Sequence, residues 1–311
     1  MSRKEKIDVV IIGGGPAGIS AAVWCSDLGL SSTILEVENR LFGQLHRIHN
    51  PITNYLGATA KNGEQLIEKF KESIDLNRLR AENGVSIAAV DCERKTITLT
   101  DEREFVSRAI FIATGVRRRT LGVPGEDRLQ GKGILRSGAD EKASVRGKRV
   151  VVVGGGDAAA ENALILADFA ERVYLVHRRE ELTARAEFRE RIASQPKIHL
   201  ELGSNVSEVG GRDRVEFVRV KSADGRESRL DAEHFIARIG VVANSELFLS
   251  QVEHDPSGYL KVDSECRTSL RGVYAIGDVA SPSSPTIATA VGMGATAAKS
   301  VNYLLTRKKT V

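Results

Sequence analysis

Short runs of apolar residues, each followed by a glycine-rich turn, are the dominant pattern of this 311-residue chain. Residues 7–12 (IDVVII) are β-branched and almost wholly apolar, which is typical of a strand buried on both faces. Residues 19–28 have a helical pattern that ends at Gly29. Residues 32–35 predict a second buried strand, which ends on Glu36. The start of the chain therefore predicts a strand–helix–strand unit.

The same order recurs in the middle of the chain, with a strand at 149–153, a helix at 160–169 and a strand at 172–176. Other patterns predict further helices and strands between and after these two units. They are a helix at 63–80, antiparallel strands at 85–90, 96–100 and 104–112, strands at 198–202, 215–222, 235–239 and 272–278, and a small-residue helix at 285–305. The chain therefore predicts an α/β fold with two Rossmann-like, three-layer ββα domains.

The turn after the first strand has the sequence GGGPAG at residues 13–18, a GxGxxG motif. In this motif Gly13 allows the tight turn, Gly15 lets backbone N–H groups approach a pyrophosphate, and Gly18 lets helix and strand pack closely. The helix N-terminus adds partial positive charge, and Glu36 is placed to accept a hydrogen bond from a ribose 2′-OH. This unit predicts a dinucleotide-binding site.

The second unit carries a related turn, GGGDAA at residues 154–159, and predicts a second dinucleotide-binding site. Its second strand ends in His177, Arg178 and Arg179 instead of an acid. Guanidinium groups at this position pair with a 2′-phosphate, which favours NADP over NAD. The alternative interpretation of these residues is a solvated basic turn.

Composition excludes several classes of protein. Hydrophobic residues make up 41% of the chain and charged residues 28%, as in soluble globular proteins. No apolar run approaches the ~20 residues of a membrane-spanning helix, and the first strand begins too early to leave room for a signal peptide, so we expect a cytoplasmic protein without a membrane partner. The net charge of +4 and the absence of a long basic block argue against nucleic acid as a partner.

Cys25, Cys92 and Cys266 are scattered along the chain, and no CxxC occurs. This spacing argues against a disulfide framework, a zinc site and a redox dithiol that is local in sequence. His46 and His49 lie three residues apart but have no further candidate ligands nearby in the sequence. We therefore expect no metal site.

Over its full length the chain resembles the low-molecular-weight thioredoxin reductases and their thioredoxin-reductase-like relatives. The stretches that carry the resemblance are residues 13–18, 43–45, 54, 113–115, 121–126, 154–159, 177–179 and 277–279. The resemblance implies a homodimer in which each chain has an NADP-binding domain inserted into an FAD-binding domain. The implied boundaries are 1–116 and 245–311 for the FAD-binding domain and 117–244 for the NAD(P)-binding domain.

The resemblance also implies which residues bind the two cofactors. For FAD these are Gly13, Gly15, Pro16, Ala17, Gly18, Glu36, Gln44, Asn54, Thr114, Gly115, Gly277, Asp278 and the backbone amide of Ile287. For NADP they are Gly154, Gly156, Asp157, Ala158, Ala159, His177, Arg178, Arg179 and Arg185.

Three departures from the family pattern shape the predicted chemistry. The positions of the redox CxxC fall on residues 137–140, where Ser137 and Asp140 replace the two cysteines; neither side chain forms the thiolate that disulfide exchange requires. Pro285 and Thr286 replace the usual Arg-Gln, and Thr183 takes the place of a later arginine, with Arg185 two residues further on. The missing thiols resemble the thioredoxin-reductase-like ferredoxin–NADP reductases, although those carry a C-terminal extension after the last helix.

We therefore predict an FAD-dependent pyridine-nucleotide oxidoreductase that is not a conventional thioredoxin reductase. NADPH would reduce the flavin, and the flavin itself would be the catalytic group. Electrons would then pass directly to a small redox carrier protein or a small molecule, such as ferredoxin, flavodoxin, a quinone or oxygen. Two alternatives stay open: a nicotinamide-independent flavoprotein with another nucleotide in the second site, and a flavin-binding sensor or scaffold with low turnover.

Overall fold

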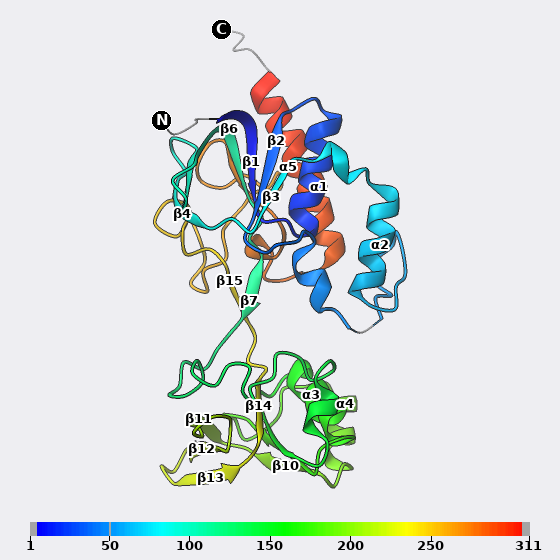
Figure 1. Cartoon of the computed structure of the whole chain (residues 1–311), viewed down its shortest axis with the longest axis vertical. Coiled ribbons are helices and arrows are strands. Elements are labelled where there is room, and N and C mark those ends of the chain that lie inside the picture. The colour runs from blue at the N-terminus through cyan, green and yellow to red at the C-terminus, as the bar shows by residue number, and fades with distance from the viewer. Residues whose placement is uncertain (1–4, 50, 307–311) are drawn as a thin grey trace. The chain divides into compact units, whose positions relative to one another are not determined.

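The computed structural model describes residues 5–49 and 51–306. The chain divides into two compact units, one formed by residues 1–117 and 242–311 and the other by residues 118–241 (Figure 1). We call them unit 1 and unit 2. The two connections between them, β7 (Val116–Arg118) and β15 (Val241–Ala243), pair with each other.

Unit 1 is built on a mixed sheet with the strand order β3-β2-β1-β6-β5-β4, and β16 pairs with β6 beside this path. Its strands are β1 (Glu5–Ile12), β2 (Ser32–Glu36), β3 (Ala81–Asn83), β4 (Ile87–Asp91), β5 (Thr96–Leu99), β6 (Glu104–Ile112) and β16 (Val273–Ala275). Strand β1 runs parallel to β2 and β6, whereas β4, β5 and β6 form the predicted antiparallel meander. The last part of the chain thus completes the sheet that the first part begins.

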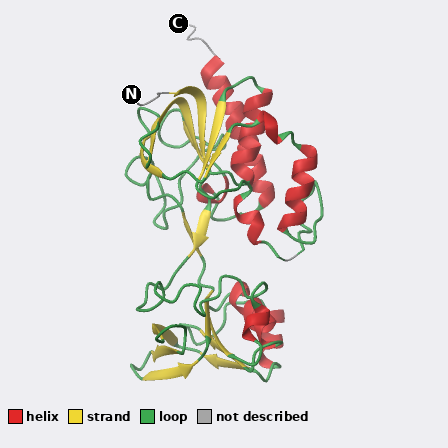
Figure 2. Cartoon of the chain, in the orientation of Figure 1, coloured by secondary structure: helices red, strands yellow, loops and turns green. Residues whose placement is uncertain are grey.

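The helices of unit 1 lie on one side of this sheet (Figure 2). They are α1 (Pro16–Asp27), α2 (Gly63–Ser73) and α5 (Ile287–Thr306), with 3₁₀ turns at Gly43–Arg47, Leu76–Arg78 and Gly277–Ala280. Alternate residues of β1 serve the two faces of the sheet: Val9 and Ile11 belong to the core with α1 and α5, while Val10 and Ile12 belong to the core with the meander. This double burial explains why the strand is apolar at nearly every position.

Helices α1 and α5 pack closely because small residues line their interface. A Cβ on Gly294 would stand 2.5 Å from the carbonyl oxygen of Ala17 and 2.8 Å from the amide nitrogen of Ala21. The hydroxyl of Ser20 on α1 donates to the carbonyl of Val291 on α5, at 2.7 Å. The start of α1 is therefore held against a helix that lies more than 250 residues later in the chain.

Unit 2 repeats this plan with a parallel sheet of order β10-β9-β8-β14 and a separate antiparallel sheet of order β11-β12-β13. The strands are β8 (Arg149–Val153), β9 (Arg172–Val176), β10 (Ile198–Glu201), β11 (Ser204–Gly210), β12 (Phe217–Ser222), β13 (Glu227–Asp231) and β14 (His234–Ala237). The helices are α3 (Asp157–Ala167) and α4 (Ala186–Ala193), and a 3₁₀ turn covers Lys142–Val145. Val150 and Val152 pack with α3, whereas Val151 and Val153 pack with the antiparallel sheet. The predicted fold of two Rossmann-type α/β units is confirmed.

Several predicted element boundaries were wrong for identifiable reasons. Helices α1 and α3 begin at Pro16 and Asp157, three residues earlier than predicted, because Gly15 and Gly156 are already their N-cap residues. Helix α2 ends at Ser73, well before residue 80, because Ile74 takes an extended conformation (φ −128°, ψ 124°). This break lets Ile74 pack against the core of unit 1. Among the described helices none is long and apolar enough to cross a membrane.

Candidate functional site

The glycine loop of unit 1 leaves the first turn of α1 open. Gly13 has a left-handed backbone (φ +110°), and a Cβ there would overlap the carbonyl of Ala113. A Cβ on Gly18 would overlap the carbonyl of Gly13, whereas a Cβ on Gly15 would meet nothing within 4 Å. Gly13 and Gly18 are therefore required for the fold, and Gly15 faces the open space above the helix N-terminus. That space, with its unpaired backbone N–H groups, fits a pyrophosphate.

Glu36 ties the end of β2 to this loop. The residue is only 6% exposed. Oε2 accepts a hydrogen bond from the backbone N–H of Gly14 at 2.6 Å, and Oε1 accepts one from that of Glu38 at 2.8 Å. Each carboxylate oxygen has two lone pairs, so capacity for a ribose hydroxyl is left. Glu36 thus shapes the loop as well as being the predicted ribose ligand.

Gln44, Thr114 and Gly115 lie together where β6 ends. The side-chain amide of Gln44 donates to the carbonyl of Val116 at 2.8 Å, and a Cβ on Gly115 would lie 3.9 Å from that amide. The hydroxyl of Thr114 donates to the carbonyl of Asn244 at 2.6 Å, and the Asn244 side-chain amide returns a bond of 2.8 Å to the carbonyl of Thr114. These two bonds fix the backbone of the predicted flavin-binding turn.

Sequence reasoning did not find Asn244, although it orients Thr114 from a position 130 residues away. The only signal was its place directly after a short apolar strand. Asn54, by contrast, lies on an exposed loop between Ile52 and Ala60, which form an isolated antiparallel bridge. Within the described part of the chain no hydrogen bond joins Asn54 to Gln44 or Thr114.

Gly277 brings the end of β16 against the start of α1. It has φ +74°, and a Cβ there would stand 2.9 Å from the Cβ of Ala17. Asp278 follows directly, and its burial raises the pKa of its carboxyl group. Helix α5 begins at Ile287, and its N-cap Thr286 accepts the amide of Thr289 at 3.1 Å. This cap leaves the amide of Ile287 as a donor for a ligand.

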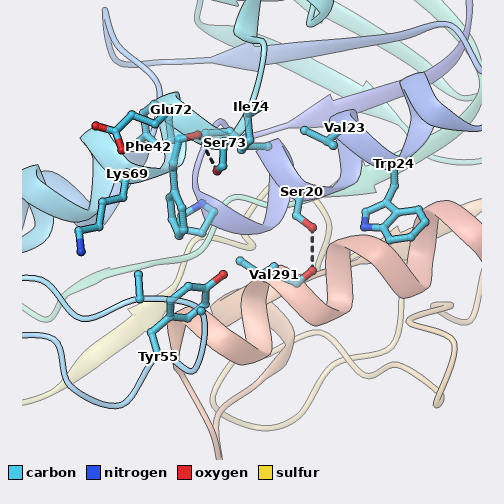
Figure 3. Close-up of a pocket in the computed structure, with 15 residues that line it drawn as sticks. Ser20, Val23, Trp24, Phe42, Tyr55, Lys69, Glu72, Ser73, Ile74 and Val291 are labelled. Carbon is cyan, nitrogen blue, oxygen red and sulfur yellow. Dashed lines mark hydrogen bonds between the residues drawn. The ribbon is translucent and has the colours of Figure 1, made fainter.

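A cavity of about 610 Å³ opens beside this arrangement, lined by residues of α1, α2, α5 and the loops between them (Figure 3). Aromatic side chains form much of its wall, including Trp24, Phe42 and Tyr55. Among the predicted cofactor residues only Pro16 lines it. The cavity is therefore a neighbour of the glycine loop and not the loop's own binding surface.

The glycine loop of unit 2 has the same construction. Gly154 is left-handed (φ +141°), and a Cβ there would overlap the carbonyl of Arg238. Gly156 is the N-cap of α3 and has only the hydroxyl of Thr183 within 4 Å of a Cβ position. The amides of Thr183 and Ala184 both donate to the carbonyl of Gly155, at 2.7 and 2.8 Å. The start of α3 is therefore open above the loop at Gly156 and at the exposed Ala158, whereas the predicted residue Ala159 is fully buried against Gly154.

The three basic residues after β9 have different surroundings. The ring of His177 is buried and lies directly against Gly155, where a Cβ would overlap it. Burial, together with Arg179 and Arg178, lowers the pKa of His177 and keeps it neutral at pH 7. Arg178 and Arg179 are exposed and form no ion pair within the described part of the chain. Their charges are available to an anionic ligand.

Arg185, another predicted NADP residue, is already paired. Its backbone N–H and Nε donate to the carboxylate of Asp157 at 2.8 and 2.7 Å. The backbone bond is the largest cause of the lowered pKa of Asp157. Arg185 Nη2 also lies 3.2 Å from Glu187 Oε1. This pairing neutralises the acid at the start of α3, where a phosphate would otherwise meet negative charge.

Residues 136–141 form a compact turn. One carboxylate oxygen of Glu141 accepts the amides of Arg136 and Ser137, at 2.6 and 2.8 Å. The hydroxyl of Ser137 accepts the amide of Asp140 at 3.3 Å. Glu141 therefore caps this turn.

All three cysteines lie in unit 1 and are free and buried. Burial is the largest cause of their raised pKa values, about 12 for Cys25 and about 11 for both Cys92 and Cys266. At pH 7 none of them is a thiolate to any useful extent. Unit 2 contains no cysteine.

Comparison with known proteins agrees with this geometry. The pyridine nucleotide-disulphide oxidoreductase family matches residues 7–294. The thioredoxin reductase of Mycolicibacterium smegmatis is 35% identical, and the match covers 96% of each chain. A 34.2 kDa protein in the rubredoxin operon of Clostridium pasteurianum is 31% identical over 96% of this chain and 97% of that protein.

Among solved structures, Lactococcus lactis thioredoxin reductase in its FR conformation has a TM-score of 0.81 at 31% identity, covering 96% of this chain and 98% of that one. Thioredoxin reductases use FAD and NADPH, so the prediction of these two cofactors is confirmed. Two open glycine loops on Rossmann-type units, matched over nearly the whole length by such relatives, lead to one conclusion: the chain belongs to the pyridine nucleotide-disulphide oxidoreductase family.

Proposed function

We propose that this protein is an FAD-dependent NADPH oxidoreductase in which electrons leave directly from the flavin, without a redox dithiol. Unit 1 binds FAD and unit 2 binds NADP. The observation that carries the proposal is the combination of two open glycine loops with cysteines that are all buried in unit 1. The positions where reductases of this family carry their dithiol lie in unit 2 and hold Ser137 and Asp140.

In unit 1 the start of α1 provides backbone N–H groups for the FAD pyrophosphate, and Glu36 provides an acceptor for the adenosine ribose. Gln44, Thr114 and Gly115 lie along the flavin side, and Asp278 accepts hydrogen bonds from hydroxyl groups of the chain that carries the flavin. Bound FAD supplies the hydride and electron chemistry. The residues of this chain named above would bind and orient it.

In unit 2 the start of α3 receives the NADP pyrophosphate, and Arg178 with Arg179 receives the 2′-phosphate. His177 stays neutral, so it holds the loop by packing without adding a third charge. The acceptor is an external redox carrier or small molecule: ferredoxin, flavodoxin, a quinone or oxygen. A small iron–sulfur carrier is supported by the relative named for its place in a rubredoxin operon. The active form is a homodimer.

The test is an anaerobic titration of the purified yellow protein with NADPH and with NADH, followed by flavin absorbance. NADPH should reduce the flavin faster. The variant Arg178→Ala/Arg179→Ala should lose this preference, because a charge-assisted phosphate contact contributes about 1.5–3 kcal/mol, roughly tenfold to a hundredfold in affinity. Equal rates with both nucleotides in the parent protein would contradict NADP selection. Bound FAD that neither nucleotide reduces would favour the nicotinamide-independent or sensor alternative.

The absence of a dithiol mechanism needs a separate assay. NADPH-dependent reduction of a panel of thioredoxins should be negligible, while ferredoxin, flavodoxin, a quinone or oxygen accepts electrons. The control is the variant Cys25→Ala/Cys92→Ala/Cys266→Ala, which should keep the activity toward these direct acceptors. Robust thioredoxin reduction that disappears in the triple variant would overturn the proposal.

A further inference from the structure

Arg238 lies at the edge of the unit 2 sheet where the dinucleotide would bind. It directly follows β14, and its backbone N–H donates to the carbonyl of Val153, the last residue of β8, at 2.7 Å. Its own carbonyl lies against Gly154, so closely that any Cβ there would overlap it. The backbone of Arg238 is therefore packed against the glycine loop that precedes α3.

The guanidinium of Arg238 is buried without a counterion. The residue is 7% exposed, and within the described part of the chain it forms no ion pair. Two of its N–H groups donate to backbone carbonyls, those of Ala237 at 2.9 Å and Arg136 at 3.0 Å. Nε is buried and has no acceptor. Burial, more than neighbouring charge, lowers the pKa of Arg238 to about 10, so it remains a cation at neutral pH.

A buried, unpaired charge destabilises the folded protein, and a variant with an apolar residue at such a site is often as stable as the parent protein or more stable. The charged groups around Arg238 do not remove this cost. Arg118 opposes the charge, and Glu141 favours it but has its carboxylate bonded to two backbone amides. The N-terminus of α3 adds further positive potential at the same edge. An anion bound at the glycine loop would compensate the positive charges of Arg238 and Arg118 and the positive potential of the α3 N-terminus together.

We propose that Arg238 is the buried cation that holds the pyrophosphate of the dinucleotide in unit 2. This inference rests on the proposed binding of NADP there and adds a residue to it. Rossmann loops bind the pyrophosphate through backbone N–H groups and the helix N-terminus. Here a side-chain charge beneath the loop reinforces them. Arg178 and Arg179 contact a different part of the ligand, the 2′-phosphate.

The test uses the FAD-loaded protein, the variants Arg238→Met and Arg238→Lys, and isothermal titration with two probes. ADP-ribose contains the pyrophosphate but no 2′-phosphate, and 2′-AMP contains the 2′-phosphate but no pyrophosphate. Arg238→Met should bind ADP-ribose, NADPH and NADH roughly tenfold to a hundredfold more weakly and bind 2′-AMP unchanged. Arg238→Lys, which keeps the charge, should retain most of the affinity. The matched control Arg178→Ala/Arg179→Ala should bind 2′-AMP and NADPH more weakly and bind ADP-ribose and NADH unchanged.

Thermal unfolding provides a second measurement, in which Arg238→Met should weaken ligand binding without lowering the stability of the protein. Without nucleotide, Arg238→Met should melt no lower than the parent protein, because it removes an unpaired buried charge. ADP-ribose should raise its melting temperature less than it raises that of the parent. If Arg238→Met binds ADP-ribose as the parent does, or melts lower without nucleotide, Arg238 has a structural role and the inference is wrong while NADP binding stands. If the parent protein binds neither NADPH nor ADP-ribose, the proposed function of unit 2 fails as well.

Discussion

Two glycines of α5 offer a direct test of how the site in unit 1 is held together. Gly294 is buried against α1, where an added Cβ would stand 2.5 Å from the carbonyl oxygen of Ala17 and 2.8 Å from the amide nitrogen of Ala21. Gly292 lies on the same helix, is exposed, and has nothing within 4 Å of a Cβ position. The substitutions Gly294→Ala and Gly292→Ala therefore add the same methyl group to the same helix in opposite environments.

The expected difference follows from these contacts. Replacing glycine by alanine within a helix favours folding by about 1 kcal/mol, and this gain is common to both variants. Only Gly294→Ala also has to separate two helix backbones, and overpacking of this kind typically costs about 1–3 kcal/mol. Because the neighbouring atoms belong to the backbone of α1, the cost should lie in the upper part of this range. For a unit of this size the two variants should differ in melting temperature by about 4–12 °C.

The assay is differential scanning calorimetry of both FAD-loaded variants, with flavin fluorescence to record release of the cofactor. Gly292→Ala should melt at or above the temperature of the parent protein. Gly294→Ala should melt below it and release FAD at a lower temperature, since α1 carries the glycine loop at its start. Equal melting temperatures for the two variants would refute the argument that close α1–α5 packing supports the loop.

Three further predictions follow from individual groups. Asn62→Ala should lower the free energy of unfolding by about 1 kcal/mol, measured by urea denaturation, because the side chain of Asn62 caps α2 at 2.9 Å. Burial raises the pKa of Asp278, so the stability linked to this group is present at low pH and lost as the pH rises through the raised pKa. Asp278→Asn should therefore melt at a higher temperature than the parent protein at neutral pH without FAD. The same variant should bind FAD more weakly. A thiol reagent should react slowly with the native protein, because every cysteine is buried. After denaturation it should react readily with all three thiols.

The parts of the fold that the sequence predicted are those with strong local signals. Strands β8 and β9 begin and end where the apolar runs do, because both faces of each strand are buried. Helix α4 was not predicted, since its eight residues include only one buried side chain, Ile192. Strands β11 and β13 were not predicted either: they contain few apolar residues, and each pairs with β12 along one edge only.

The same distinction applies to the candidate site. The glycine loops were found because backbone geometry demands glycine at Gly13 and Gly154, and this demand is visible in the sequence. Asn244 and Arg238 were missed because their roles depend on partners more than 80 residues away. The pairing of Arg185 with Asp157 could not be foreseen from spacing alone.

Unit 1 is assembled from both ends of the chain, and this has a consequence for biosynthesis. When residues 118–241 have left the ribosome, unit 2 has all of its strands and can fold, but β16 and α5 have not yet emerged. Until they emerge, the nascent chain exposes the edge of β6 that β16 will cover and the small-residue face of α1 that α5 will cover. We therefore expect the middle of the polypeptide to acquire its native structure first. The interval before α5 emerges is then the period in which the growing chain is most exposed to aggregation.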